Sequence, residues 1–226
     1  MPDREVLAFD LYGTLVDPLA ISGELERVLG IPDGDRVAQL WRLKQLEYSF
    51  RLTVMGHYED FGWVTSRALD FTLAALGLPS AQSRELAGFY NLLQPFPDAK
   101  PALQALSGLG YELAVLSNGS PGMIRSCLEH SGLCDYIGLR ISVDEIRAFK
   151  PSPVVYRHAA GRMGRPPGQV RLVTCNAFDS VGASAAGMRT AWVNRPAGPF
   201  DTIGQAPDVT VSTLTQLPAV LASGIS

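Results

Sequence analysis

Short, mainly apolar runs, several of them ending beside polar residues, are the feature that most limits how this chain can fold. They cover residues 6–9, 113–116, 170–174, 191–193 and 208–211. Continuous apolar runs of this length are typical of strands buried on both faces. Helical patterns lie between the later runs, and two of them start with Ser120-Pro121 and Ser152-Pro153, a capping residue before a first-turn proline. Strands alternating with helices predict an α/β fold with a doubly wound parallel sheet.

A long segment between the first and second runs has a different character. Between residues 17 and 96, apolar residues recur at helical spacing, as in Leu40, Leu43 and Leu46, and no strand pattern is present. We therefore expect an α/β core formed by residues 1–16 and 97–226, with an all-helical insertion at 17–96.

Composition excludes several classes of protein. The 226 residues carry a formal net charge of −3 without a block of Lys and Arg, which argues against a nucleic-acid partner. No apolar stretch approaches the ~20 residues that span a bilayer, and the first residues lack the apolar core of a secretory signal. The odd set Cys127, Cys134 and Cys175 contains no C-x-x-C pair, so we expect reduced thiols and a cytoplasmic location.

Polar residues at the carboxyl ends of the predicted strands form one candidate site, because ligands of open parallel sheets collect at that edge. The set comprises Asp10, Ser117, Asn118, Asn176 and Asp179. Asp10 ends the first strand and precedes a Gly-Thr turn. A buried carboxylate is costly unless it is paired or hydrogen-bonded. From this string alone, Asp10 is either a functional acid or a cap on the amides of its own loop.

Four motifs in a fixed order resemble those of the haloacid dehalogenase superfamily. They are Asp10-Leu11-Tyr12-Gly13-Thr14-Leu15, Ser117-Asn118, Lys150-Pro151, and the segment from Asn176 to Asp179. The resemblance covers nearly the whole chain. It implies a Rossmann-like core, and it implies that the helices of 17–96 form a cap subdomain over the site.

Tyr12 separates two chemistries of that superfamily. Its phosphatase members carry a second aspartate at this position, which protonates the leaving alkoxide. A phenol with an ordinary pKa near ~10 is a poor acid for that task, whereas a halide leaves without a proton. Tyr12 therefore favours dehalogenation. A Mg²⁺-dependent phosphatase, with Asp10 and Asp179 holding the metal, is the alternative reading, and a non-catalytic binding protein with a relict site is the second.

The segment from Leu40 to Tyr48, with the sequence L-W-R-L-K-Q-L-E-Y, is similar to a cap helix of the L-2-haloacid dehalogenases. The resemblance makes Arg42 the halide-binding residue. It departs from the family pattern at Leu43, where a glutamine is common, and at Phe178, where some relatives have tryptophan. We expect Leu43 to make the pocket more apolar.

The resemblance also implies a role for each further site residue. Asp10 is the nucleophile, Lys150 keeps it ionised, and Asp179 activates the water that cleaves the ester. The other catalytic positions are Asn176, Thr14 and Thr174. Arg42 and Asn118 hold the halide, and Ser117 binds the substrate carboxylate. The remaining pocket positions are Leu11, Tyr12, Leu46, Phe61, Tyr156 and Phe178. A 2-haloacid is the expected substrate, with no metal or cofactor, and a homodimer the expected assembly.

Overall fold

A parallel β-sheet forms the centre of the molecule in a computed structural model, which describes residues 4–223. Within them, six strands pair in the order β3-β2-β1-β4-β5-β6, and every pair is parallel. The strands are β1 (Val6–Phe9), β2 (Leu113–Ser117), β3 (Leu139–Ser142), β4 (Val170–Thr174), β5 (Arg189–Val193) and β6 (Val209–Val211). This order is that of a Rossmann-type doubly wound sheet, and it confirms the predicted fold class.

The sequence pattern misses one of these strands. Each of the five predicted runs corresponds to an observed strand, but β3 was not among them. It is an edge strand paired only with β2, and Arg140 within it is exposed. Because one side of an edge strand faces solvent, its sequence need not be continuously apolar.

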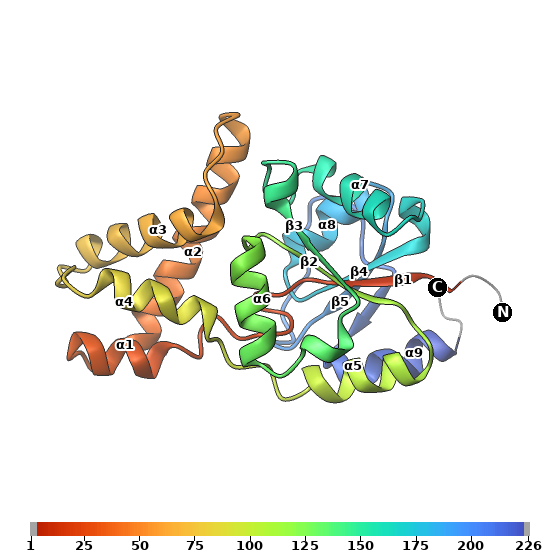
Figure 1. The fold of residues 1–226 in the computed structure, drawn as a ribbon, viewed down its shortest axis with the longest axis horizontal. Coiled ribbons are helices and arrows are strands. Elements are labelled where there is room, and N and C mark those ends of the chain that lie inside the picture. Colours follow the sequence, from red (N-terminus) through yellow and green to blue (C-terminus); the bar gives the residue numbers. More distant parts are fainter. Residues whose placement is uncertain (1–3, 224–226) are drawn as a thin grey trace.

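Helices cover both faces of the sheet. In Figure 1, α5 (Ala99–Gly108) and α9 (Leu217–Ala222) lie below the strands, while α7 (Pro153–Arg162) and α8 (Ala177–Ala185) lie above them. The helix α6 (Pro121–His130) follows β2. None of the helices between residues 4 and 223 combines the length and the apolar character needed to cross a bilayer. Short 3₁₀ turns complete the regular structure at Phe89–Asn91, Cys134–Tyr136, Val143–Glu145, Pro167–Gln169 and Leu214–Gln216.

Four helices between β1 and α5 lie together beside the sheet, at the left of Figure 1. They are α1 (Ser22–Leu29), α2 (Gly34–Val54), α3 (Phe61–Ala75) and α4 (Ser83–Gly88). Aspartates start the two longest of them, because the side chain of Asp33 accepts from Arg36 N and that of Asp60 accepts from Trp63 N.

The chain leaves and re-enters the core at adjacent positions. Val16 forms an isolated antiparallel bridge with Pro95, and Phe96 N donates to Leu15 O at 3.0 Å. The helical segment is therefore attached to the core beside the loop that follows β1.

Glycine at position 182 sets the distance between α8 and its neighbours. A Cβ atom there would lie 2.6 Å from Pro151 Cβ and 2.7 Å from the Tyr156 hydroxyl. We expect Gly182→Ala to lower the free energy of unfolding by about 1–3 kcal/mol through overpacking. Gly161→Ala in α7 is the matched control, since nothing lies within 4 Å of its Cβ. That change should stabilise the fold by about 0.4–1 kcal/mol. Urea unfolding measures both, and an equal midpoint for the two variants would contradict this packing.

Candidate active site

Asp10 follows β1 and lies at the centre of a buried hydrogen-bond network. Only 5% of its surface is exposed. Its Oδ2 accepts from Thr14 Oγ1 at 3.0 Å and from Asn176 Nδ2 at 2.7 Å, while its Oδ1 accepts from Lys150 Nζ at 3.1 Å. Three donors therefore satisfy the buried carboxylate, one of them a cation. This makes Asp10 more than a cap on its own loop.

Lys150 bridges two carboxylates. Its Nζ lies 3.1 Å from Asp10 Oδ1 and 2.9 Å from Asp179 Oδ2, and the side chain is 2% exposed. Burial alone would lower the pKa of Lys150, but the charges of Asp10 and Asp179 outweigh burial and raise it above its ordinary value. The ammonium therefore remains protonated between its two partners.

Asp179 lies in the first turn of α8 and is fully buried. Burial raises the pKa of its carboxyl above the ordinary value, Lys150 opposes this, and Asp10 adds to it. A carboxylate with a raised pKa is a stronger base. Tyr156 donates to Asp179 Oδ1 at 2.7 Å. The structure thus gives the Tyr156 hydroxyl a protein partner, where the sequence predicts contact with substrate.

Arg42 reaches the loop after β1 from the helical segment. Its Nη2 donates to Tyr12 O at 3.2 Å, two residues beyond Asp10, and its Nη1 donates to Gln45 Oε1 at 2.7 Å. Gln45 is fully buried and donates in turn to Thr65 Oγ1 of α3 at 2.7 Å. Sequence reasoning overlooked Gln45, although a polar residue three positions after the arginine on one helix face was a usable signal.

Aromatic rings pack around Tyr12, in the loop of residues 11–16 that follows Asp10. The Tyr12 ring lies 5.4 Å from the ring of Phe61 and 6.0 Å from that of Tyr90. The Tyr12 hydroxyl is buried and has no hydrogen-bond partner among residues 4–223. Burial raises the pKa of this phenol well above its ordinary value. Tyr12 is therefore not equipped to protonate a leaving group near neutral pH.

The loop between β2 and α6 brings further donors to this edge of the sheet. Asn118 Oδ1 accepts from Lys150 N at 3.0 Å, which leaves its Nδ2 as the group able to meet a ligand. Ser117 Oγ is buried and accepts from Gly119 N at 3.0 Å. Ser120 caps α6 through Met123 N, so a helix N-terminus with its favourable field for anions begins beside the site.

The other predicted residues occupy varied places. Thr174 accepts from Asn176 N through its Oγ1, so it orients Asn176. Phe178 is half-buried, with its ring 5.2 Å from that of Phe50 on α2. Leu11 is fully buried and Leu46 half-buried. The expectation for Leu43 is wrong: its side chain is 65% exposed, because it lies on a different face of α2 from Gln45.

Arg195 is the second residue that sequence reasoning missed. It follows β5 and donates through Nη2 to Thr14 O at 2.9 Å and through Nη1 to Gly13 O at 3.4 Å. No motif marked it, because its partners lie far away in the sequence.

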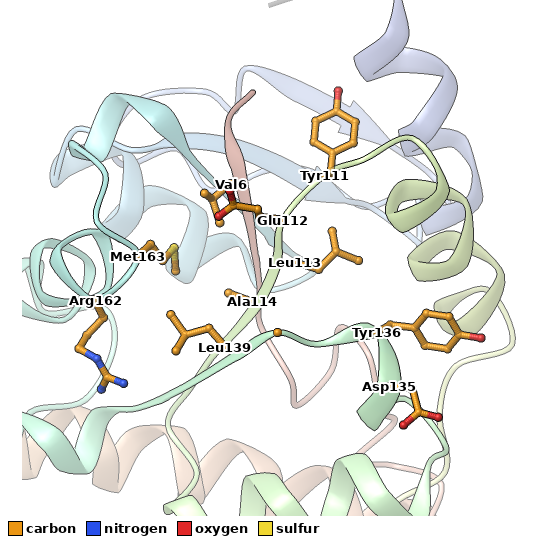
Figure 2. A pocket seen from close by; sticks show the side chains of 11 residues that line it. Val6, Tyr111, Glu112, Leu113, Ala114, Asp135, Tyr136, Leu139, Arg162 and Met163 are labelled. Atoms are coloured by element: carbon orange, nitrogen blue, oxygen red, sulfur yellow. The ribbon is translucent and has the colours of Figure 1, made fainter. Parts of the chain in front are cut away.

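Two of the cavities among the described residues border the core, one of them between the core and α2. One of about 540 Å³ lies beside Lys150 and is lined by Phe50, Thr53 and Val54 of α2 together with residues 149–152. The other, of about 460 Å³, lies at the amino ends of β1, β2 and β3, where Val6, Leu113 and Leu139 line it (Figure 2). None of the predicted site residues contributes to this second cavity.

Two carboxylates, those of Asp10 and Asp179, lie at this edge of the sheet around the ammonium of Lys150. Within residues 4–223, no group of three or more His, Cys, Asp or Glu side chains is arranged to hold a metal ion. Asp10 and Asp179 are instead joined by the ammonium of Lys150.

Comparison with known proteins points to one family. A profile of haloacid dehalogenase-like hydrolases matches residues 5–187. The chain is 38% identical to the (S)-2-haloacid dehalogenase of Pseudomonas sp. strain YL, covering 92% of this chain and 90% of that protein. It is 36% identical to haloacetate dehalogenase H-2 of Moraxella sp. strain B, over 98% and 100% of the two chains. The L-2-haloacid dehalogenase of Xanthobacter autotrophicus, solved with chloropropionic acid covalently bound, superposes with a TM-score of 0.90 at 34% identity, over 97% and 98%.

Removal of the bridging ammonium should make stability depend on pH. We expect Lys150→Met to cost about 3–5 kcal/mol near pH 7, because two buried carboxylates lose their cation. Loss of Lys150 removes the charge that opposes burial at Asp179, so the pKa of Asp179 rises further above its unfolded value and the folded variant binds more protons than the folded wild type. Its stability therefore increases as the pH falls, and the deficit relative to the wild type shrinks between pH 7 and 5.

Denaturant unfolding at several pH values measures this deficit. Lys100→Met is the control, since Lys100 is exposed on α5 and should change stability by less than about 0.5 kcal/mol. A deficit of Lys150→Met that stays constant with pH would contradict the bridge.

Proposed function

Because the chain belongs to the haloacid dehalogenase-like hydrolases, we propose that it is an (S)-2-haloacid dehalogenase. It converts a short 2-haloalkanoic acid to the 2-hydroxy acid with inversion at C2. The observation that carries this proposal is that Arg42 of α2 reaches the loop after Asp10, where its Nη2 donates to the carbonyl of Tyr12 at 3.2 Å. A nucleophile and a cation for the leaving halide are then parts of one site.

Positive groups make the approach of an anionic substrate tolerable. Two like charges ~4 Å apart repel by about 4 kcal/mol at an effective dielectric near 20. Lys150 contacts the nucleophile directly, and Arg42 contributes a second cation beside the same loop. The start of α6 and the backbone of the 117–120 loop receive the substrate carboxylate. The protein itself supplies this positive charge, so the reaction needs no metal.

Ester formation is the first step. Asp10 Oδ1 attacks C2 from the side opposite the halogen, so a C–O bond forms, the carbon–halogen bond breaks, and the configuration inverts. The halide leaves with the bonding electrons toward Arg42 and Asn118 Nδ2. No proton is required, which agrees with the buried, weakly acidic phenol of Tyr12. Oδ2 keeps its bonds to Thr14 and Asn176 and becomes the carbonyl oxygen of the ester.

Hydrolysis of the ester is the second step. Asp179 accepts a proton from a water molecule, which attacks the acyl carbon of Asp10, while Thr14 and Asn176 stabilise the charge that develops on Oδ2. Lys150 donates a proton to the alkoxide as it leaves with the original Oδ1, and protonated Asp179 passes its proton to the resulting amine of Lys150 through their hydrogen bond. The Asp10 carboxyl keeps the second proton of the water and releases it to regenerate the carboxylate. The net reaction consumes one water and yields the hydroxy acid, the halide and a proton.

The helical segment acts as a cap in this proposal. Residues 17–96 form the cap subdomain and residues 1–16 and 97–226 the core. Support comes from the two adjacent crossings at Val16 and Pro95 and from Arg42, which extends from α2 to the core loop. The half-buried Leu46 and Phe178 and the buried Phe61 form the apolar wall for the substrate chain.

We place the protein in the cytoplasm as a homodimer. Its three cysteines are free, which fits a reducing compartment. Large apolar side chains on the cap helices are exposed, including Leu43, Trp63 and Phe71, and a second copy of the chain would cover them. A sedimentation mass near that of the 24.3 kDa monomer would contradict the dimer.

A single turnover in ¹⁸O-labelled water tests the chemistry. With enzyme in excess over (S)-2-chloropropionate and EDTA present, we expect one chloride per substrate and an ¹⁸O atom in the peptide that contains Asp10. The label enters there because water attacks the acyl carbon of the ester. Chloride titration and mass spectrometry of the digest make the two measurements.

The alternatives predict different results. Label found only in the hydroxy acid would mean direct attack of water on C2, which contradicts the ester. Loss of activity in EDTA together with hydrolysis of a generic phosphate ester would favour a Mg²⁺-dependent phosphatase. Binding of the haloacid without chloride release would favour the non-catalytic protein.

Loss of the cap guanidinium should abolish most of the activity. We expect Arg42→Met to lower kcat/KM for (S)-2-chloropropionate by at least about 30-fold, because a departing halide would lose its cation in a desolvated site. Arg51→Met is the matched control on the same helix, where the exposed Arg51 pairs with Glu47. Chloride release measures both variants. Equal kcat/KM values in the two variants would remove Arg42 from the site.

A further inference from the structure

Arg195 contacts the loop of residues 11–16 that follows Asp10, donating to the carbonyls of Gly13 and Thr14. We propose that Arg195, held by Asp98, is a positioning residue that keeps the Thr14 hydroxyl on Asp10 and thereby sets the rate of ester formation. This inference rests on the function proposed above. Arg195 follows the carboxyl end of β5, at the same edge of the sheet as Asp10 and Asn176.

All donors of the guanidinium are engaged. Nε and Nη2 form a fork on Asp98, at 3.2 and 2.8 Å from its two oxygens, and the side chains of Arg195 and Asp98 are only 20% and 14% exposed. Nη2 also donates to Thr14 O at 2.9 Å, and Nη1 contacts Gly13 O and Cys175 Sγ. A guanidinium has five N–H groups, and these five contacts account for them.

A short chain of bonds connects Arg195 with the nucleophile. Thr14 accepts from Arg195 at its carbonyl and donates to Asp10 Oδ2 at 3.0 Å through its hydroxyl. The same hydroxyl accepts from Cys175 N at 2.9 Å, and the Cys175 sulfur contacts Arg195. The guanidinium thus holds both residues that fix the hydroxyl on the carboxylate.

The aromatic ring of Phe96 fixes the plane of this guanidinium. Arg195 Cζ lies 3.9 Å from the centroid of the Phe96 ring, close enough for a cation–π contact. Phe96 lies on the returning crossing from the helical segment and bonds to Leu15 O. Arg195 therefore also ties the loop of residues 11–16 to the chain that carries the helices.

The side-chain chemistry of arginine explains why this position is hard to replace. Lysine would keep the charge, but its three donors on one nitrogen cannot span Asp98, Thr14 O and Gly13 O together. Loss of the fork lets the Gly13–Thr14 segment move, and a displacement of the reacting group by about 1 Å costs on the order of 100-fold in rate. Substrate binding should change little, because Arg42 and the start of α6 carry it.

The test compares Arg195→Met, Arg195→Lys and Asp98→Asn with Arg189→Met. Arg189 lies on β5 and pairs with Glu5, 48% exposed and away from the Asp10 loop. In single-turnover chloride release from (S)-2-chloropropionate, we expect Arg195→Met to form the ester about 100-fold more slowly, with KM within about threefold of the wild type. The rate of ester formation in Arg195→Lys should remain well below that of the wild type despite its charge. The rate in Asp98→Asn should lie between those of Arg195→Lys and the wild type, and the rate in Arg189→Met should equal that of the wild type.

Each other outcome has a defined meaning. Wild-type rates in Arg195→Met would overturn the inference while chloride release by the wild type leaves the proposed function intact. No chloride release by the wild type itself would instead refute the function. If Arg195→Met fails to fold, Arg195→Lys and Asp98→Asn decide. In folded variants, kcat could instead fall and KM rise together, in proportion to the decrease in melting temperature. That result would show that Arg195 has only a structural role, and it would overturn the inference.

Discussion

One ammonium group between two buried carboxylates is the interaction on which the rest of this site depends. Lys150 joins Asp10 and Asp179, which come from the ends of β1 and from the start of α8. Without that cation, at least one carboxylate would be protonated or the site would open to water. In the mechanism proposed above, the bridge pairs the nucleophile Asp10 with a cation, and burial gives Asp179 the raised pKa that suits a base. The Lys150 ammonium is therefore needed both to stabilise the two buried carboxylates and for the proposed reaction.

The sequence points to the groups that we propose to react more directly than to the residues that hold them in place. Asp10 stands directly after β1 and Asp179 in the first turn of α8, where a parallel sheet brings polar residues together whatever their separation along the chain. Lys150 lies in the loop between β3 and α7 and is predicted only from the Lys150-Pro151 motif. The buried strands could be read from their apolar runs for the same local reason. Arg195 could not be found in this way, because its importance lies in contacts with the carbonyls of Gly13 and Thr14. For Gln45 the one signal was its spacing of three residues from Arg42 on the same helix.

Two errors have a common physical origin. The strand β3 was missed because an edge strand is polar on its open side, and Leu43 was assigned to the pocket although α2 turns it to solvent. Both depend on which side of an element faces the core. Tertiary packing decides that side, and a short sequence window reports it weakly. On α2, the bonds of Trp41 and Gln45 to Thr65 set the rotation of the helix and so the direction of Arg42.

Two arginines donate hydrogen bonds to consecutive backbone carbonyls of the loop that follows Asp10. Tyr12 O accepts from Arg42, and Gly13 O and Thr14 O accept from Arg195. Carbonyl oxygens carry partial negative charge, and three of them beside Asp10 would repel an anionic substrate if they were unpaired. Because one guanidinium comes from α2 and the other follows β5, the same bonds that screen these oxygens also join the helical segment, the loop and the sheet. The same hydrogen bonds therefore neutralise the carbonyls of the loop and hold its conformation. A guanidinium can do both because it has several donors in fixed directions, whereas a lysine ammonium is a compact charge, and this explains the arginines at positions 42 and 195.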